Sequence, residues 1–366
     1  MKFITEQHWE ETKKRYLAWW ANGLYERPLL YVVAKKQPSG EFEDPGEAAD
    51  PKEARTNIDY VIKRARYNAD THAWLGDTYP NFSLNLGPGT LALYLGSEPR
   101  FAWDTVWFDP CMEDIHEGWR FRADPNAKWF KYEMAALKYA MARMGDEFFY
   151  GFPDIVENID ILSAMRDPQE LCVDMMDEPE EVKRRIAQID VLYEYYYNLF
   201  YDVIKQPDGS SFYSAFRVWG PGRTAKIQCD FSALISVNHF REFVLPSLVR
   251  QCDYIDNTVY HLDGPQAVKH VPALMEIKKL KALQFTCGEM RPDGTNEEWW
   301  PVYDQARKAG KALWVQVYDE GPDQWMKNID RFIKRYGANG MYFRMPEFEN
   351  EEIANEFIRK AELDWH

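Results

Sequence analysis

The sequence lacks the features that mark secreted and membrane proteins. It has only five cysteines in 366 residues, an odd number without any Cys-x-x-Cys pair, which favours free thiols in a reducing compartment. No apolar run approaches the roughly 20 residues that a membrane-spanning helix needs. Residues 1–20 are polar and amphipathic, and they lack the apolar centre of a secretory signal. We therefore expect a soluble, cytoplasmic protein.

Positive charge is scarce as well. The chain has 44 Lys and Arg against 59 Asp and Glu, a formal net charge of −15, and its basic residues are scattered. Proteins that bind nucleic acid normally present a basic face, so we expect a small-molecule substrate and no nucleic-acid partner. Aromatic residues, in contrast, make up 16% of the chain and include 14 Trp. They suit either a bulky core or a pocket for a large, flat or cationic ligand.

The order of the expected elements indicates an α/β fold. Residues 1–128 contain helices and irregular loops, whereas strands and helices alternate strictly over residues 129–366. Such alternation predicts a parallel sheet wrapped by helices, and about eight units favour closure into a (β/α)8 TIM barrel. We expect residues 1–366 to form this one domain. The expected strands lie at 29–33, 148–152, 211–218, 259–261, 283–286, 313–317 and 340–343.

One strand end carries the clearest candidate for an active site. Active sites of such barrels lie at the carboxyl ends of the strands. His261 ends a short predicted strand, and Asp263 follows two residues later, so both side chains can point to the same face of an extended segment. This pair can bind a metal, or act as a base with its orienting carboxylate, and we predict that both residues are catalytic. The alternative is that Asp263 caps the next helix and His261 is an ordinary interior residue.

Polar residues also follow the other predicted strands or lie in the loops after them. We expect these to bind substrate: Glu157, Asn158, Trp219, Arg223, Asp230, Gln284, Glu289, Gln316 and Arg344. Arg223 could clamp a carboxylate or phosphate, whereas Asp154 and Glu157 also have the spacing of a helix capping box. Cys287 could join His261 as a metal ligand. A sugar cleft that uses two of Glu157, Asp263 and Glu289 is a further interpretation.

Several motifs together resemble the uroporphyrinogen decarboxylase superfamily. Residues 230–236 (Asp-Phe-Ser-Ala-Leu-Ile-Ser) and 240–246 (Phe-Arg-Glu-Phe-Val-Leu-Pro) resemble its acidic loop and the start of the next helix, with Val237 in place of the usual Pro. Residues 260–265 resemble its following strand end. Matches to an uncharacterised branch from anaerobes lie at 85–89, 95–98 and 104–107. The resemblance covers most of the chain and implies a (β/α)8 barrel.

The resemblance brings two chemistries, and this chain departs from the pattern of each. Uroporphyrinogen decarboxylases hold substrate carboxylates with an N-terminal Arg-rich motif, which is missing from residues 21–30. Cobamide-dependent methyltransferases that act on thiols bind zinc through His-x-Cys and a later Cys. Here His261 matches the histidine, Asp263 stands at the first cysteine position, and no cysteine lies near Met345. Other relatives transfer methyl groups between a corrinoid protein and tetrahydrofolate without a metal.

The resemblance therefore implies a corrinoid-linked methyltransferase. It would move a methyl group between a cobamide, carried by a partner corrinoid protein, and a small acceptor such as tetrahydrofolate or a thiol. Zinc is a second candidate cofactor, although the usual cysteine ligands are missing. Two alternatives stay open: decarboxylation of a carboxylated tetrapyrrole such as uroporphyrinogen, and a non-catalytic protein that binds a tetrapyrrole or corrinoid. Because decarboxylase relatives are often dimers, we expect a monomer or homodimer.

Overall fold

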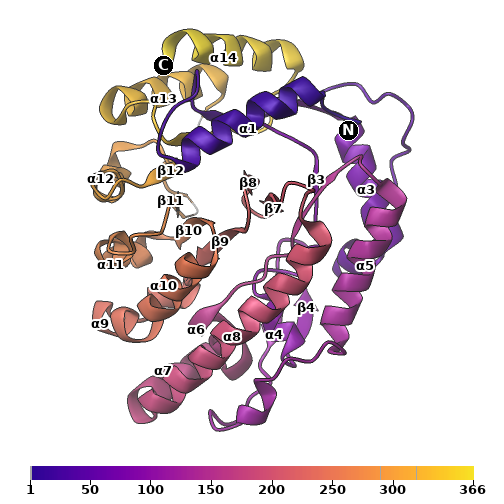
Figure 1. Cartoon of the computed structure of the whole chain (residues 1–366). Coiled ribbons are helices and arrows are strands. Elements are labelled where there is room, and N and C mark those ends of the chain that lie inside the picture. The colour runs from indigo at the N-terminus through magenta and orange to yellow at the C-terminus, as the bar shows by residue number, and fades with distance from the viewer. Residues whose placement is uncertain (1, 289, 319) are drawn as a thin grey trace.

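Helices surround a set of mostly parallel strands in the computed structural model, which describes residues 2–288, 290–318 and 320–366 (Figure 1). The α-helices are α1 Glu6–Trp20, α2 Pro51–Thr56, α3 Ile58–Asp70, α4 Thr90–Tyr94, α5 Lys128–Met144, α6 Asn158–Arg166, α7 Pro168–Asp177, α8 Pro179–Ile204, α9 Val237–His239, α10 Leu245–Tyr254, α11 Val271–Met275, α12 Trp300–Lys308, α13 Pro322–Tyr336 and α14 Glu351–Asp364. The strands are β1 Leu29–Lys35, β2 His72–Gly76, β3 Asn81–Phe82, β4 Glu98–Phe101, β5 Val106–Asp109, β6 Phe149–Phe152, β7 Ser211–Tyr213, β8 Val218–Gly220, β9 Thr224–Gln228, β10 Asn257–Asp263, β11 Ala282–Thr286, β12 Ala312–Gln316 and β13 Met341–Arg344.

The described strands form a large sheet, a smaller sheet and the two-stranded sheet β4-β5. The large sheet has the order β2-β1-β13-β12-β11-β10-β9, in which all neighbours are parallel except the β1–β2 pair. The smaller sheet has the order β3-β6-β7-β8, with only β8 antiparallel to its neighbour. Helices α9 to α14 follow one another around the outside of the large sheet (Figure 1). These observations confirm an α/β fold. The described strand pairs form separate sheets, so the closed eight-stranded barrel stays a prediction.

The predicted strand at 211–218 was wrong, and a neighbouring strand was missed. The segment is a hairpin in which β7 and β8 pair antiparallel around a turn at 214–217. Arg217 in this turn has a φ of 53°, a left-handed conformation that allows the chain to reverse. Strand β9 then follows and is buried at every position. Its apolar pattern is interrupted by Lys226 and Gln228, so it does not read as a buried strand.

The remaining elements agree with the sequence to different degrees. Strands β10 to β13 lie within about two residues of their expected positions. Helices α2 and α3 are separated at Asn57, whose side chain accepts a hydrogen bond from the Tyr60 N–H and so caps α3. The stretch at 76–110, expected to be irregular, contains the β4–β5 hairpin and the buried helix α4.

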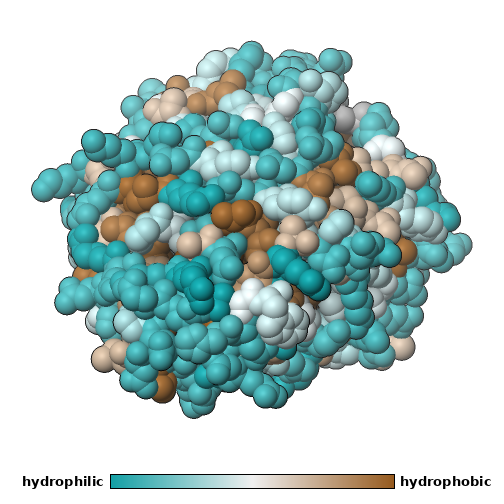
Figure 2. Space-filling view, turned by 60° about the horizontal axis from the view of Figure 1, so that its bottom comes forward, coloured by the Kyte–Doolittle hydropathy of each residue, from teal (hydrophilic) through white to brown (hydrophobic). Residues whose placement is uncertain are grey.

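The polar composition of the sequence is visible on the surface of the molecule and in the character of its helices. Figure 2 shows a face that is mostly hydrophilic, with smaller hydrophobic patches among the polar side chains. Within the described ranges, no helix combines the length and the apolar character that crossing a bilayer would require.

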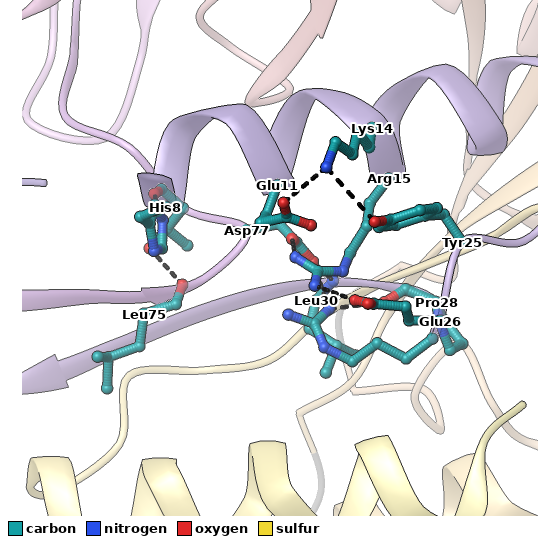
Figure 3. Close-up of polar contacts among 12 residues, drawn as sticks. His8, Glu11, Lys14, Arg15, Tyr25, Glu26, Pro28, Leu30, Leu75 and Asp77 are labelled. Atoms are coloured by element: carbon teal, nitrogen blue, oxygen red, sulfur yellow. Dashed lines mark hydrogen bonds and ion pairs between the residues drawn. The ribbon is translucent and has the colours of Figure 1, made fainter. Parts of the chain in front are cut away.

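A buried ion cluster joins α1 to the amino end of β1 (Figure 3). The Asp77 carboxylate, which follows β2, is 1% exposed and accepts hydrogen bonds from Arg15, Arg27 and the Leu30 N–H. Arg15 Nη1 lies 3.1 Å from Asp77 Oδ1, and its Nη2 lies 2.7 Å from Glu26 Oε2. One carboxylate therefore compensates two buried guanidinium groups at the end of the sheet opposite to the strand carboxyl ends.

We expect Asp77→Asn to lower the free energy of unfolding by about 3–5 kcal/mol, because it leaves the two arginines without their shared negative charge. Urea unfolding monitored by circular dichroism measures the change. Glu11→Gln is the control, since it removes only the exposed Glu11–Lys14 pair and should leave stability nearly unchanged. Equal stability of the two variants would show that the buried cluster does not hold α1 in place.

Candidate active site at the carboxyl ends of β9 and β10

Three possible metal-ligating side chains converge where β9 and β10 end. One ligand atom each of Asp230, His261 and Asp263 lies within 4.8 Å of the other two, and this is the one such group of three or more among the described residues. His261 is half-buried, whereas the two carboxylates are reached by water. The same-face placement of His261 and Asp263 follows from their spacing on β10. Asp230 joins them because β9 lies beside β10 in parallel.

The strand register fixes how the imidazole is held. His261 is in register with Gln228 on β9 and with Gln284 on β11. His261 Nδ1 contacts Gln284 Oε1, while Gln284 Nε2 donates to Thr286 Oγ1 at 3.1 Å. The amide therefore presents an acceptor to the ring, so Nδ1 carries the proton and Nε2 keeps its lone pair in the neutral imidazole. This leaves Nε2 able to bind a metal or accept a proton.

A buried lysine next to the cluster, Lys226, contributes a positive charge that lowers the pKa of His261. Lys226 on β9 is 1% exposed, lies 2.8 Å from Asp154 Oδ1 and contacts Gln228 Oε1. Burial, followed by the positive charge of Lys226, lowers the pKa of His261 below its usual value. The imidazole is therefore neutral at physiological pH, the form in which histidine ligates metals.

The pKa values of the carboxyl groups near Lys226 are raised, whereas that of His261 is lowered. Although water reaches Asp230, the surrounding protein leaves its carboxylate poorly solvated, and the negative charge of Asp160 adds to this effect, so the pKa of Asp230 rises to about 7. Burial likewise raises the pKa of Asp160, and it raises that of the fully buried Glu157 well above its ordinary range. Several acids thus share one cation in a poorly solvated site.

The end of the loop after β6 and the first turn of α6 hold Asp230 in place. Asp160 accepts hydrogen bonds from the backbone N–H groups of Asp230 at 2.8 Å and Phe231 at 2.9 Å. Asn158, at a φ of 57°, donates to the Gln228 carbonyl and accepts from the Asp160 N–H. Glu157 Oε1 accepts from the Gln228 N–H, and its Oε2 has no hydrogen-bond partner among the described residues. These groups order the start of the 3₁₀ turn Asp230–Leu234.

The helix-capping alternatives do not match the geometry. Glu157 precedes α6 but makes no side-chain capping bond. Asp154 instead pairs with Lys226 and accepts a hydrogen bond from the Tyr213 hydroxyl at 2.8 Å. Gly264, not Asp263, occupies the capping position of the turn after β10, and no side chain caps that turn. Asp263 is therefore available to a ligand.

Two predicted site residues lie elsewhere. Trp219 is inside β8, is 3% exposed and packs against Trp9 and Tyr16 of α1, so it belongs to the aromatic core. Arg223 immediately precedes β9 and therefore lies at the opposite end of this strand from Asp230. Its guanidinium lies about 5 Å from the ring centres of two tyrosines, Tyr201 and Tyr254. The structure therefore does not bring these two residues to the cluster, because the hairpin and β9 were not recognised in the sequence.

The other predicted residues lie around the strand ends, except for Glu289, which lies outside the described residues. Cys287 and Gln316 line a recess of about 790 Å³ together with Asp263. Cys287 is buried and is not part of the three-residue cluster. Arg344 ends β13, and its guanidinium lies over the rings of Tyr31 and Trp314. The predicted His261–Cys287 metal pair is thus not the group that the structure brings together.

Lys226, Asp160 and Phe216 also lie at this site, although none of them was predicted from the sequence. The Phe216 ring centroid lies 5.0 Å from that of His261, and Lys226 Nζ lies 5.6 Å from the Phe216 ring centre. The signal for Lys226 was present as a lone basic residue between Ala225 and Ile227. It becomes informative only when this segment is recognised as a buried strand, because a lysine is almost never fully buried unless it is paired.

Comparisons with known proteins support the fold. No family model matches the sequence, and no curated protein sequence matches it. Among solved structures, the chain is similar to a methyltransferase from Methanosarcina mazei, with a TM-score of 0.63 and 14% sequence identity. The similarity covers 96% of this chain and 98% of that chain. The two chains therefore share an overall fold along nearly their whole lengths.

We expect Lys226→Met to raise the pKa of His261, because a nearby positive charge that opposes its protonation is removed. Histidine ring signals followed by NMR across a pH titration measure the change, with the His261 signal assigned from a His261→Asn sample. Lys269→Met is the matched control, since Lys269 acts on His270 and should not affect His261. A His261 pKa that stays constant or falls in Lys226→Met would refute this role of the lysine.

Proposed function

We propose that this chain is a metal-dependent methyltransferase that moves a methyl group between a corrinoid, carried by a partner protein, and a small acceptor. The observation that carries the proposal is the convergence of Asp230, His261 and Asp263 within 4.8 Å at the strand ends. Its likeness in fold to a methyltransferase supports the reaction class, as does the resemblance of several motifs to the uroporphyrinogen decarboxylase superfamily, one branch of which is made up of cobamide-dependent methyltransferases.

The chemistry of the donor set fits a divalent transition metal such as zinc. One imidazole nitrogen and two carboxylate oxygens are ligands that zinc accepts, and three protein ligands leave a position for substrate. Gln284 would orient His261 by accepting a hydrogen bond from its Nδ1–H group, as the outer partner of a metal-bound histidine usually does. When bound, the metal would act as a Lewis acid that lowers the pKa of an acceptor thiol or hydroxyl. A thiolate-rich zinc site does not fit, because Cys287 lies outside the cluster.

The surrounding residues have distinct roles in this proposal. Asp160 positions Asp230 through two backbone hydrogen bonds. Because the pKa of Asp230 is raised in the metal-free site, protons would compete with the metal for this carboxylate, and metal affinity should fall as the pH drops below neutral. Phe216 covers one side of His261 and limits the access of water. The recess beside Asp263 gives a small acceptor space to approach the exposed carboxylate. Tetrahydrofolate and thiols are both candidate acceptors.

The test is methyl transfer from methylcobalamin by the zinc-supplied protein, with thiols and tetrahydrofolate as acceptors. We expect turnover by the wild type and a loss in His261→Ala that exceeds the roughly 10- to 100-fold typical of an outer-shell substitution such as Gln284→Ala. His116→Ala is the control, because His116 is exposed and far along the chain from the cluster, and it should retain full activity.

Two results would count against the proposal. Methyl transfer by His261→Ala at the wild-type rate would show that the metal cluster takes no part in the reaction. A lack of transfer to every acceptor, together with carbon dioxide release from uroporphyrinogen, would instead favour the decarboxylase alternative.

A further inference from the structure

A second recess, of about 670 Å³, lies next to the cluster and is lined by several polar side chains with unused bonding capacity. Asp154 lines this recess and is also the ion-pair partner of Lys226. Since Lys226 acts on His261 of the cluster, Asp154 and Lys226 together separate the recess from the cluster. Buried Asn81 Oδ1 and Ser214 Oγ have no hydrogen-bond partner among the described residues, although both residues line this space. Unpartnered buried polar atoms are costly unless something else satisfies them.

The recess also contains two guanidinium groups without a bound carboxylate. Arg217 lines it, and among the described residues its guanidinium makes no hydrogen bond or ion pair. Within the described ranges, the hydrogen bonds of the Arg55 guanidinium go to three backbone carbonyls, those of Asn85, Ala102 and Trp103, each at 3.3 Å. The negative charge of Asp104, in the same lining, acts on Arg55 without a hydrogen bond. In contrast, the third arginine of the lining, Arg64, is paired with Asp44 at 3.1 Å.

The backbone at Arg217 is strained and held in place. Its φ of 53° is uncommon for a residue with a side chain, and glycine or asparagine would adopt it at lower cost. The hydroxyls of Tyr16 and Tyr342 donate to the Arg217 carbonyl at 2.7 and 3.0 Å, which locks the turn. The preceding residue, Phe216, packs on the His261 ring. One rigid turn thus places a cation in the recess and an aromatic ring on the candidate catalytic histidine.

We propose that this recess binds the carboxylate of a small organic monoacid, with Arg217 as the principal anchor and Arg55 as the second cation. The charge balance favours a single negative charge. Two of the charged lining residues are already neutralised, Asp154 by Lys226 and Arg64 by Asp44. The remaining charged lining residues are the two cations Arg55 and Arg217 and the anion Asp104, which leaves one net positive charge. A guanidinium binds the two oxygens of a carboxylate in a fork. Trp74, Phe148 and Phe152 offer apolar surface for the body of the acid.

If the proposed function holds, the bound acid would be the methyl acceptor or donor, and only this part of the inference rests on the proposed function. Binding itself needs neither a methyl donor nor a metal. Failure of the binding test would leave methyl transfer to neutral acceptors untouched, and failure of methyl transfer would leave the acid site untouched.

The experiment is calorimetric titration of the full-length protein with benzoate, with its neutral analogue benzamide, and with phenyl phosphate. We expect benzoate to bind more tightly than the other two. Arg217→Asn, which suits the positive φ, should weaken benzoate binding at least about ten-fold, because a charged hydrogen-bonding partner is lost. Arg217→Lys, which keeps the charge but loses the fork, should give an intermediate affinity.

The matched control is Arg64→Gln, which removes the same formal charge from the same lining but from an arginine that is already paired. It should change benzoate affinity much less than Arg217→Asn does. Equal binding of benzoate and benzamide, or equal affinities of Arg217→Asn and the wild type, would overturn the proposal. Tighter binding of phenyl phosphate than of benzoate would overturn the assignment to a monocarboxylate.

Discussion

The buried ammonium of Lys226 is the constraint on which the site depends. It is enclosed by protein and compensates a group of acids on the loop after β6 and at the end of β9, among them Asp154 and Glu157. A buried charge is stable only when it is paired and hydrogen-bonded. The segment after β6 therefore lies against β9. This contact places the Asp160 carboxylate on the backbone N–H of Asp230, and Asp230 then completes the cluster with the two residues of β10.

The same charge arrangement prepares the cluster for chemistry. Burial, and after it the positive charge of Lys226, lower the pKa of His261, so the imidazole stays neutral with Nε2 unprotonated. Poor solvation, and after it the negative charge of Asp160, raise the pKa of Asp230 to about 7. The turn that carries Phe216 and Arg217 connects this centre to the neighbouring recess, because Phe216 packs on the His261 ring while Arg217 lines the recess.

Local patterns in the sequence were sufficient for part of this picture. The two-residue spacing of His261 and Asp263 predicted their common face, because side chains alternate along any extended strand. The α/β class followed from alternating elements. Trp219 and Arg223 were misplaced because a hairpin and a strand that contains Lys226 and Gln228 were not visible as such. A buried strand with two polar residues has no apolar period, and its polar residues make sense only from their tertiary partners. Arg217 gave no signal, because its significance lies in its φ and in an unpaired guanidinium.

X-ray absorption at the zinc edge of the zinc-loaded protein tests the central claim most directly. The account predicts one bound zinc whose first shell contains only nitrogen and oxygen, at about 2.0–2.2 Å. A sulfur scatterer at about 2.3 Å would show that a cysteine, rather than the carboxylates beside His261, holds the metal, and it would contradict the account.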